Sequence, residues 1–160
     1  MDILVIYLWV LDNLEVVGGA GLSLLALYYL WPANKEHILL KRFGLDPAEW
    51  RVLGHDLGRG GTPYGVKALG LIGKPDFVAQ HRRSKTLKVF DYKHRTFKGK
   101  PRLYEVYQVS LYCMALESMN PGYKVLAAIK FKNIILDVHV HDSDRAKLLR
   151  NRDLFRSKYL

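Results

Sequence analysis

The chain has 160 residues, a formal net charge of +10 and a single cysteine, Cys113. One cysteine excludes an intramolecular disulfide, a cysteine-based zinc site and a cysteine-ligated iron–sulfur cluster. All 25 Lys and Arg residues follow residue 31, whereas three of the 15 acidic residues precede it, so residues 32–160 carry a formal charge of +13. Such a basic segment favours a polyanionic partner, either a nucleic acid or an anionic membrane surface.

Residues 1–31 are almost continuously apolar, and Val16–Trp31 is their longest uninterrupted part. This run is slightly shorter than the ~20 residues that cross a bilayer. Leu14 and the aromatic residues near Trp31 extend it and suit the membrane interface. We therefore predict that residues 1–31 form an N-terminal membrane anchor with one transmembrane helix. A core or oligomerisation helix, and a helix hairpin that uses Ile3–Leu11 as an interfacial segment, are the alternatives.

The charges around this segment predict its orientation. A cleaved signal peptide would begin with Lys or Arg and end at small residues, whereas this segment begins with an acid and ends at Trp31-Pro32. Basic residues follow the span at Lys35, Lys41 and Arg42, and none precede it. The positive-inside rule therefore predicts a single-pass membrane protein with its C-terminal domain in the cytoplasm.

Residues 32–160 are expected to form one domain, which begins with a short helix followed by a glycine-rich loop. The segment Pro32–Gly44 predicts a short helix with a basic face, ended by Gly44. The next recognisable segment, Gly54–Gly65, contains five glycines and a proline and predicts a loop.

A β-hairpin is predicted next. Two apolar runs, Ala68–Gln80 and Leu87–Tyr92, flank the polar, basic segment His81–Thr86. In this hairpin the sequence Gly73-Lys74-Pro75-Asp76 lies in the first strand, and Asp91-Tyr92-Lys93 ends the second.

The rest of the chain predicts a helix, a strand pair and another helix. Apolar residues recur at helical spacing through Leu103–Met119, and Asn120-Pro121-Gly122 ends that helix. Strands are predicted for Tyr123–Lys132 and Ile134–His141, and Ser143 is expected to cap a C-terminal helix. The order of elements predicts an α/β fold in which helices flank a mixed β-sheet.

The hairpin brings two carboxylates and a lysine together. Asp91 and Lys93 are two residues apart, so on a strand both side chains leave the same face, and pairing with the first strand brings Asp76 to them. A divalent cation would relieve the repulsion between the carboxylates and activate water, while the ammonium would stabilise charge on a phosphate. The pattern therefore indicates metal-dependent phosphodiester hydrolysis.

The segments GLIGKPDFV, VFDYK and YQVSLY resemble the RecB-like nucleases of the PD-(D/E)xK superfamily, including its CRISPR-associated exonuclease branch. The resemblance covers about Leu53–Phe131. It implies a restriction-endonuclease-like core in residues 32–160, a Mg²⁺ or Mn²⁺ cofactor, and DNA as the substrate.

The same resemblance implies roles for individual residues. Asp76 and Asp91 would bind the metal together with the Tyr92 carbonyl, and Lys93 would be the catalytic lysine. The remaining pair, Gln108 and Tyr112, resembles the Gln-xxx-Tyr motif that positions the site and the DNA.

The sequence departs from this family pattern at two points. Its single cysteine cannot supply the four that hold an iron–sulfur cluster in the CRISPR-associated branch, so no cluster is expected. Many relatives also carry an upstream His or Glu as a further metal ligand. The candidates here are Glu36, His37, His55 and Asp56, of which the adjacent pair His55-Asp56 is preferred.

Basic residues around the proposed site are candidates for binding DNA phosphates. They are Arg82, Arg83, His94, Arg95, Lys98 and Lys100. The sequence analysis thus predicts a membrane-anchored, cytoplasm-facing deoxyribonuclease that depends on Mg²⁺ or Mn²⁺. A non-catalytic membrane adaptor that holds DNA, and a dimeric structure-selective resolvase on the same fold, are the alternatives.

Overall fold

The computed structural model describes residue 19, residues 35–58 and residues 61–159. The chain divides into two compact units, Met1–Leu39 and Leu40–Leu160. Within the described residues, no helix is both long and apolar enough to cross a bilayer. The predicted transmembrane run, Val16–Trp31, lies outside the described residues except for Gly19.

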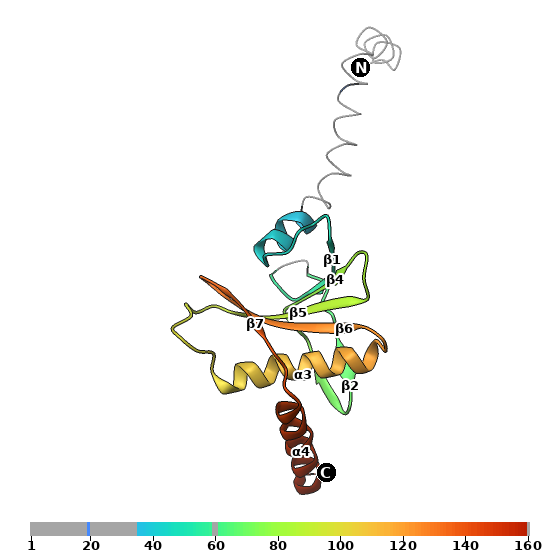
Figure 1. Cartoon of the computed structure of the whole chain (residues 1–160), viewed down its shortest axis with the longest axis vertical. Coiled ribbons are helices and arrows are strands. Elements are labelled where there is room, and N and C mark those ends of the chain that lie inside the picture. Colours follow the sequence, from blue (N-terminus) through green and yellow to red (C-terminus); the bar gives the residue numbers. More distant parts are fainter. Residues whose placement is uncertain (1–18, 20–34, 59–60, 160) are drawn as a thin grey trace, which may run out of the picture. The chain divides into compact units, whose positions relative to one another are not determined.

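A five-stranded mixed sheet forms the centre of the second unit, in the order β1-β4-β5-β6-β7 (Figure 1). The strands are β1 (Trp50–His55), β4 (Phe77–His81), β5 (Thr86–Lys93), β6 (Lys124–Phe131) and β7 (Ile135–Val138). β5 and β6 are parallel, and the other neighbours are antiparallel. The predicted α/β class with a mixed sheet is confirmed, and it is consistent with a restriction-endonuclease-like core.

Helix α3 (Leu103–Met119) connects the parallel strands β5 and β6 and packs on one face of the sheet (Figure 1). Its bounds are those predicted from the sequence. The last turn ends at Asn120, whose side-chain Nδ2 donates to the Leu116 carbonyl at 2.9 Å. Helix α4 (Asp142–Tyr159) packs against α3, and Arg145 Nη2 lies 3.0 Å from Glu117 Oε1.

The two faces of the sheet carry different cores. On the α3 side, Val78 and Val89 pack with Val109 of the helix. Successive strand residues point to opposite faces, so Phe77 and Phe90 point away from α3. There Phe43 stacks on Phe77 with a centroid distance of 4.3 Å. By the same alternation, Asp91 and Lys93 share the α3 side with Val89.

The short helix before β1 agrees with its prediction over the described residues. Residues 35–42 are helical. Gly44 then adopts φ +68°, a left-handed conformation that favours glycine, and the Leu45 N–H donates to the Leu40 carbonyl at 3.0 Å.

The segment predicted to form one hairpin contains two hairpins in the structure. β4 and β5 form the larger one, whereas β2 (Val66–Ala68) and β3 (Leu71–Gly73) form a separate two-stranded sheet. The turn between β2 and β3 has positive φ at both central residues, 54° at Leu69 and 69° at Gly70, as a type I′ turn requires. Leucine rarely adopts this conformation, so the apolar run of the sequence concealed the turn.

Three further expectations were wrong in detail. Gly54 and His55 belong to β1 and not to the loop, because β1 pairs with β4. Lys74-Pro75-Asp76 precedes β4 and does not lie within it, since proline has no N–H for a strand ladder. Helix α4 begins at Asp142, which places Ser143 inside its first turn and not at its cap.

Candidate active site

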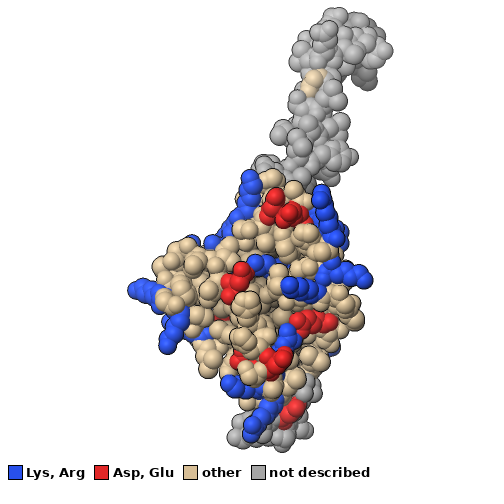
Figure 2. All heavy atoms as spheres, in the orientation of Figure 1, with Lys and Arg blue, Asp and Glu red and all other residues tan. Residues whose placement is uncertain are grey.

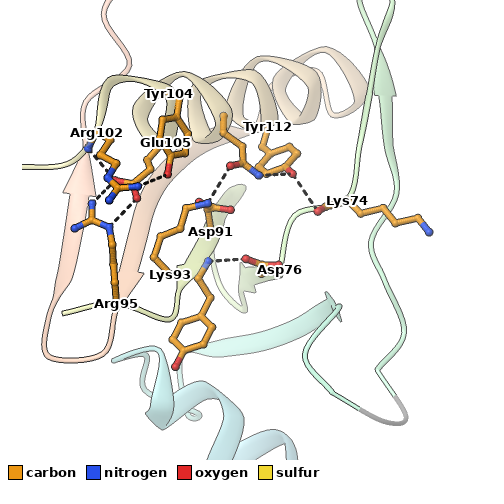
Figure 3. A network of polar contacts seen from close by, with 11 residues as sticks. Lys74, Asp76, Asp91, Lys93, Arg95, Arg102, Tyr104, Glu105 and Tyr112 are labelled. Atoms are coloured by element: carbon orange, nitrogen blue, oxygen red, sulfur yellow. Dashed lines mark hydrogen bonds and ion pairs between the residues drawn. The ribbon is translucent and has the colours of Figure 1, made fainter. Parts of the chain in front are cut away.

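The end of β5 brings Asp91 and Lys93 into contact (Figure 3). Lys93 Nζ lies 2.6 Å from Asp91 Oδ2, and Asp91 is only 2% exposed. The two groups form a buried ion pair, and apart from Lys93 the described residues offer Asp91 Oδ2 no hydrogen-bond partner. A buried carboxylate oxygen in this state can accept a further cation or donor.

Burial raises the pKa of Asp91 to about 6. Lys93 opposes the increase, whereas the negative charges of Asp76 and Glu105 add to it. The Asp91 carboxylate is therefore held in a poorly solvated position, where Lys93 offsets only part of the cost of burying its charge.

Asp76 joins this pair through the backbone of β5. The Tyr92 N–H donates to Asp76 Oδ2 at 2.6 Å (Figure 3). Phe77, the next residue, pairs with Phe90, so Asp76 lies beside the β5 residues that carry the site. The N–H and C=O of one strand residue point to the same side, and the Tyr92 carbonyl is therefore directed toward Asp76.

The oxygen atoms gathered here fit a divalent cation of the magnesium type. Carboxylate and carbonyl oxygens are its preferred protein ligands, usually few in number with water completing the shell. Asp76, Asp91 and the Tyr92 carbonyl would supply them, and Asp91 Oδ2, whose one polar partner among the described residues is Lys93, is in place to do so. Among the described residues, no three His, Cys, Asp or Glu side chains form a group that could hold a metal ion.

The preferred upstream pair, His55 and Asp56, adjoins Asp76 through its main chain. The Asp56 N–H donates to the Asp76 carbonyl at 2.9 Å, and His55 pairs with Phe77. The Asp56 side chain is exposed, and His55 Nδ1 accepts from the Leu57 N–H at 3.4 Å. The backbone of this pair therefore lies at the site, but its side chains do not form a metal-binding cluster with the other acidic residues described.

Gln108 and Tyr112 project from α3 toward the same site. Lys93 Nζ donates to Gln108 Oε1 at 3.0 Å, and Gln108 Nε2 donates to the Tyr112 hydroxyl at 3.2 Å. The hydroxyl donates to the Lys74 carbonyl at 3.1 Å (Figure 3). Tyr112, expected to help position the site and the DNA, bonds within the protein and holds the segment that leads to Asp76.

Burial raises the pKa of Tyr112, and the hydrogen bond from Gln108 opposes that increase. The hydroxyl therefore keeps its proton near neutral pH, as its donation to the Lys74 carbonyl requires. The chain of hydrogen bonds joins β5, α3 and the segment before β4 in one network.

Glu105 is a buried residue of this region that the sequence analysis missed. Both of its oxygens accept from Arg95, at 3.0 Å from Nε and 2.6 Å from Nη2. Burial acts to raise the pKa of Glu105, but the Arg95 bond and the Arg102 N–H outweigh it and keep that pKa below its usual range. The sequence could have indicated its role, because Glu105 lies in the first turn of the predicted helix, where a Glu often accepts a hydrogen bond from the backbone of the preceding cap residue.

Arg95, a candidate for contact with nucleic acid, makes several contacts within the protein. Besides its bidentate contact with Glu105, its guanidinium lies 4.7 Å from the ring centroid of Phe131. These contacts tie the segment after β5 to α3 and to the end of β6. The sequence could not show this, because it does not reveal which acid a given arginine meets.

The other predicted DNA-binding residues occupy two ends of the sheet. His94, Lys98 and Lys100 follow β5 on the side of Lys93 and are exposed. Arg82 and Arg83 precede β5 and lie at its opposite end, roughly 20 Å away at ~3.3 Å per residue. The expectation that both groups flank the site was therefore wrong for the arginine pair.

Arg82 also has intramolecular partners, since its Nε donates to the carbonyls of Pro47 and Trp50 at 3.2 and 3.1 Å. Figure 2 shows Lys and Arg side chains spread over the visible face of the second unit, with Asp and Glu among them. On that face, the described basic residues do not gather into one patch.

A family model described as the PD-(D/E)XK nuclease superfamily matches residues 6–153. The matched range includes Asp76, Asp91, Lys93 and Gln108. No protein with a curated description matches the chain.

Proposed function

Because this chain belongs to the PD-(D/E)XK nuclease superfamily, we propose that it is a Mg²⁺- or Mn²⁺-dependent deoxyribonuclease that hydrolyses phosphodiester bonds. The observation that carries the proposal is the buried Asp91 carboxylate paired with Lys93, with Asp76 bound to the next backbone N–H. The contact between Gln108 and Lys93 supports assignment to the RecB-like branch. A single cysteine is inconsistent with the iron–sulfur cluster of its CRISPR-associated members.

Asp76, Asp91 and the Tyr92 carbonyl would hold the cation. When bound, it supplies Lewis acidity that polarises the phosphodiester and makes water a better nucleophile. Lys93 stabilises the negative charge that develops on the phosphate. The Gln108 side-chain oxygen is a second acceptor for the Lys93 ammonium, so the lysine stays in place when Asp91 serves as a metal ligand. Tyr112 keeps the segment before Asp76 against α3.

Incubation of the purified full-length protein with linear and circular DNA, with and without Mg²⁺ or Mn²⁺, tests the proposal. Asp91→Asn is the control for contaminating nucleases. Metal-dependent loss of linear DNA alone indicates an exonuclease, and nicking of circles indicates an endonuclease. Binding without cleavage under every condition would reject the nuclease and support a DNA-binding adaptor.

We also propose that Val16–Trp31 anchors the protein in a membrane with the nuclease domain in the cytoplasm. The apolar composition and the basic residues that follow the segment support this placement. The protein should then pellet with membranes and remain there after a high-salt wash that removes electrostatic attachment. The family match begins at residue 6, inside the apolar segment. If the protein is recovered in the soluble fraction without detergent, the apolar segment is instead a helix of the domain core or of an oligomer.

A further inference from the structure

The segment that joins the short helix to β1 packs on the sheet face that lies away from α3. Phe43 stacks on Phe77 of β4 and meets Phe90 of β5 edge-on, at centroid distances of 4.3 and 5.0 Å. A Cβ at Gly44 would lie 2.9 Å from Ile135 Cδ1 of β7, so glycine lets the backbone lie directly on the sheet. These contacts hold the end of the short helix against the sheet.

Arg42, the residue before this aromatic contact, lies over Tyr92 at the end of β5. Its guanidinium carbon is 5.1 Å from the centroid of the Tyr92 ring, and the residue is exposed. Among the described residues, no carboxylate pairs with Arg42. The ring orients the guanidinium without occupying its N–H donors, so these donors are available to an oxyanion.

Two further nitrogen-bearing side chains adjoin the same ring. Lys130 of β6 is the register partner of Tyr92, and register partners on neighbouring strands share a sheet face. The His94 ring lies 4.6 Å from the Tyr92 ring, measured between centroids. No acidic side chain in the described part of the chain pairs with Lys130 or His94. By contrast, Lys88 on the same face of β5 is paired with Asp137 at 2.7 Å, so positive charge is left uncompensated beside Tyr92.

This basic cluster lies at the same strand end as the proposed metal site. Tyr92 stands between Asp91 and Lys93, and its N–H donates to Asp76 Oδ2 at 2.6 Å. Because Asp91 and Lys93 point to the α3 side, the Tyr92 ring points to the other face. A nucleic-acid strand that places one phosphate beside Lys93 and crosses the strand end therefore brings a neighbouring phosphate to Arg42.

We propose that Arg42 and Lys130, with His94 beside them, bind the phosphate of the substrate strand that neighbours the phosphate being cleaved. The inference rests on the proposed nuclease function and adds a phosphate subsite to it. Arg42 donates to the non-bridging oxygens, Lys130 supplies a second positive charge, and Tyr92 keeps the guanidinium in position. The ligand is a phosphodiester, because the fork of a guanidinium matches two oxygens that share one negative charge.

The salt dependence of binding tests the subsite in the full-length Asp91→Asn protein, which is expected to bind DNA without cutting it. Adding Arg42→Gln should weaken binding of a short single strand about tenfold and reduce the slope of log affinity against log salt by roughly 0.7. Arg51→Gln is the matched control, since this exposed arginine also has a neutral partner, Gln80, but lies near the opposite end of the sheet. It should leave both quantities unchanged. Equal slopes for Arg42→Gln and its parent would overturn the proposal.

A neutral linkage locates the phosphate relative to the cut. The protein without substitutions is incubated with Mg²⁺ and oligonucleotides that each carry one methylphosphonate, an uncharged analogue of the phosphodiester, at a different position. The cut itself reports which linkage occupies the active site, so the products give the offset at which a neutral linkage suppresses cleavage. Suppression from an adjacent linkage should be about tenfold and should largely disappear in Arg42→Gln. If it persists in Arg42→Gln, other residues bind that phosphate.

The two experiments separate this subsite from the nuclease function. If the protein binds DNA with a slope that depends on Arg42 but never cleaves, the nuclease proposal fails and the phosphate site stands. If it cleaves DNA and Arg42→Gln changes neither the slope nor the methylphosphonate pattern, the nuclease proposal stands and the phosphate site is excluded.

Discussion

Gln108 holds Lys93 from a different element of the fold, with its side-chain oxygen 3.0 Å from the lysine Nζ. The lysine therefore has two acceptors, the Asp91 carboxylate at the end of its own strand and the amide of α3. A cation that takes over Asp91 would leave Lys93 attached to the helix, and the ammonium would stay beside the phosphate.

We expect Asp76→Asn, Asp91→Asn and Lys93→Ala each to reduce metal-dependent cleavage by on the order of 1000-fold or more, because each removes a ligand or a charge used in the transition state. Circular dichroism should show a folded protein in every case. Single-turnover assays with linear DNA measure the loss, and a variant that cuts at the wild-type rate is not part of the site.

Gln108→Ala should slow cleavage by about 10- to 1000-fold, because it removes a group that positions Lys93 without contacting the reacting atoms. Tyr112→Phe should reduce the cleavage rate less than Gln108→Ala does. The Tyr112 hydroxyl does not contact Lys93, and it acts only through Gln108 and the Lys74 carbonyl. Single-turnover rates at saturating metal separate these effects from weaker metal binding. Rates equal to wild type for Gln108→Ala would show that the contact with Lys93 is not used.

In the metal-free protein, Asp91→Asn should raise thermal stability near neutral pH. The pKa of Asp91 increases from 3.8 to about 6 on folding, so the folded protein binds a proton at Asp91 more tightly than the unfolded chain does. The stability gained from that proton is fully present below about pH 4 and is lost as the pH rises through 6. Removing the charge should recover at most ~3 kcal/mol above pH 6, a limit that already includes the opposing effect of Lys93.

Thermal unfolding of both proteins between pH 4 and 8, in the presence of a chelator, measures this difference. Asp137→Asn is the control, because that acid is largely exposed beside Lys88. A gain in melting temperature that is the same at pH 4 and pH 8 would contradict the assignment to Asp91 titration.

Glu105→Gln should destabilise the fold by about 1 to 3 kcal/mol, because the buried Glu105 carboxylate loses its charge-assisted hydrogen bonds to Arg95. The matched control is Glu117→Gln on the same helix, whose partner Arg145 and own side chain are each about 30% exposed. That change should cost below about 1 kcal/mol. Urea unfolding compares the two, and equal losses would indicate that burial of Glu105 is not the cause.

Salt dependence should separate the two groups of basic residues. Lys98→Ala together with Lys100→Ala should reduce the slope of log affinity against log salt by roughly 1 to 2 for a short DNA bound at the site. Arg83→Ala should leave that slope unchanged, because Arg83 lies at the far end of β5. Fluorescence anisotropy in increasing KCl measures both, and a larger effect of Arg83→Ala would place the DNA on the other end of the sheet.

The sequence predicted the elements that have strong local signals. Helix α3 has helical spacing of apolar residues and ends at Asn120-Pro121-Gly122, and its bounds were predicted correctly. Asp91 and Lys93 were placed on one face because strand geometry alone requires it. β1 was missed, since its sequence WRVLGH lacks an alternating pattern and adjoins a glycine-rich loop. Its pairing with β4 decides its conformation.

Side-chain partners were harder to predict than elements. Nothing local distinguishes Arg95, which binds Glu105, from the exposed Lys98 three residues later. Tyr112 was expected to act together with Gln108, and the two side chains do contact each other. Its acceptor, the Lys74 carbonyl, depends on where the β2–β3 hairpin packs, and the unusual turn at Leu69 made that hairpin invisible in the sequence.

The parallel pairing of β5 with β6 has a consequence for how the protein refolds. It joins Thr86 to Lys124 and Lys93 to Phe131, residues far apart in the chain, whereas β4 and β5 are linked by a short turn. Closing the longer loop is entropically more costly, so the hairpin can form before the parallel pair. The sheet around Asp91 and Lys93 is complete only when β6 pairs with β5, so recovery of nuclease activity should lag behind formation of the β4–β5 hairpin.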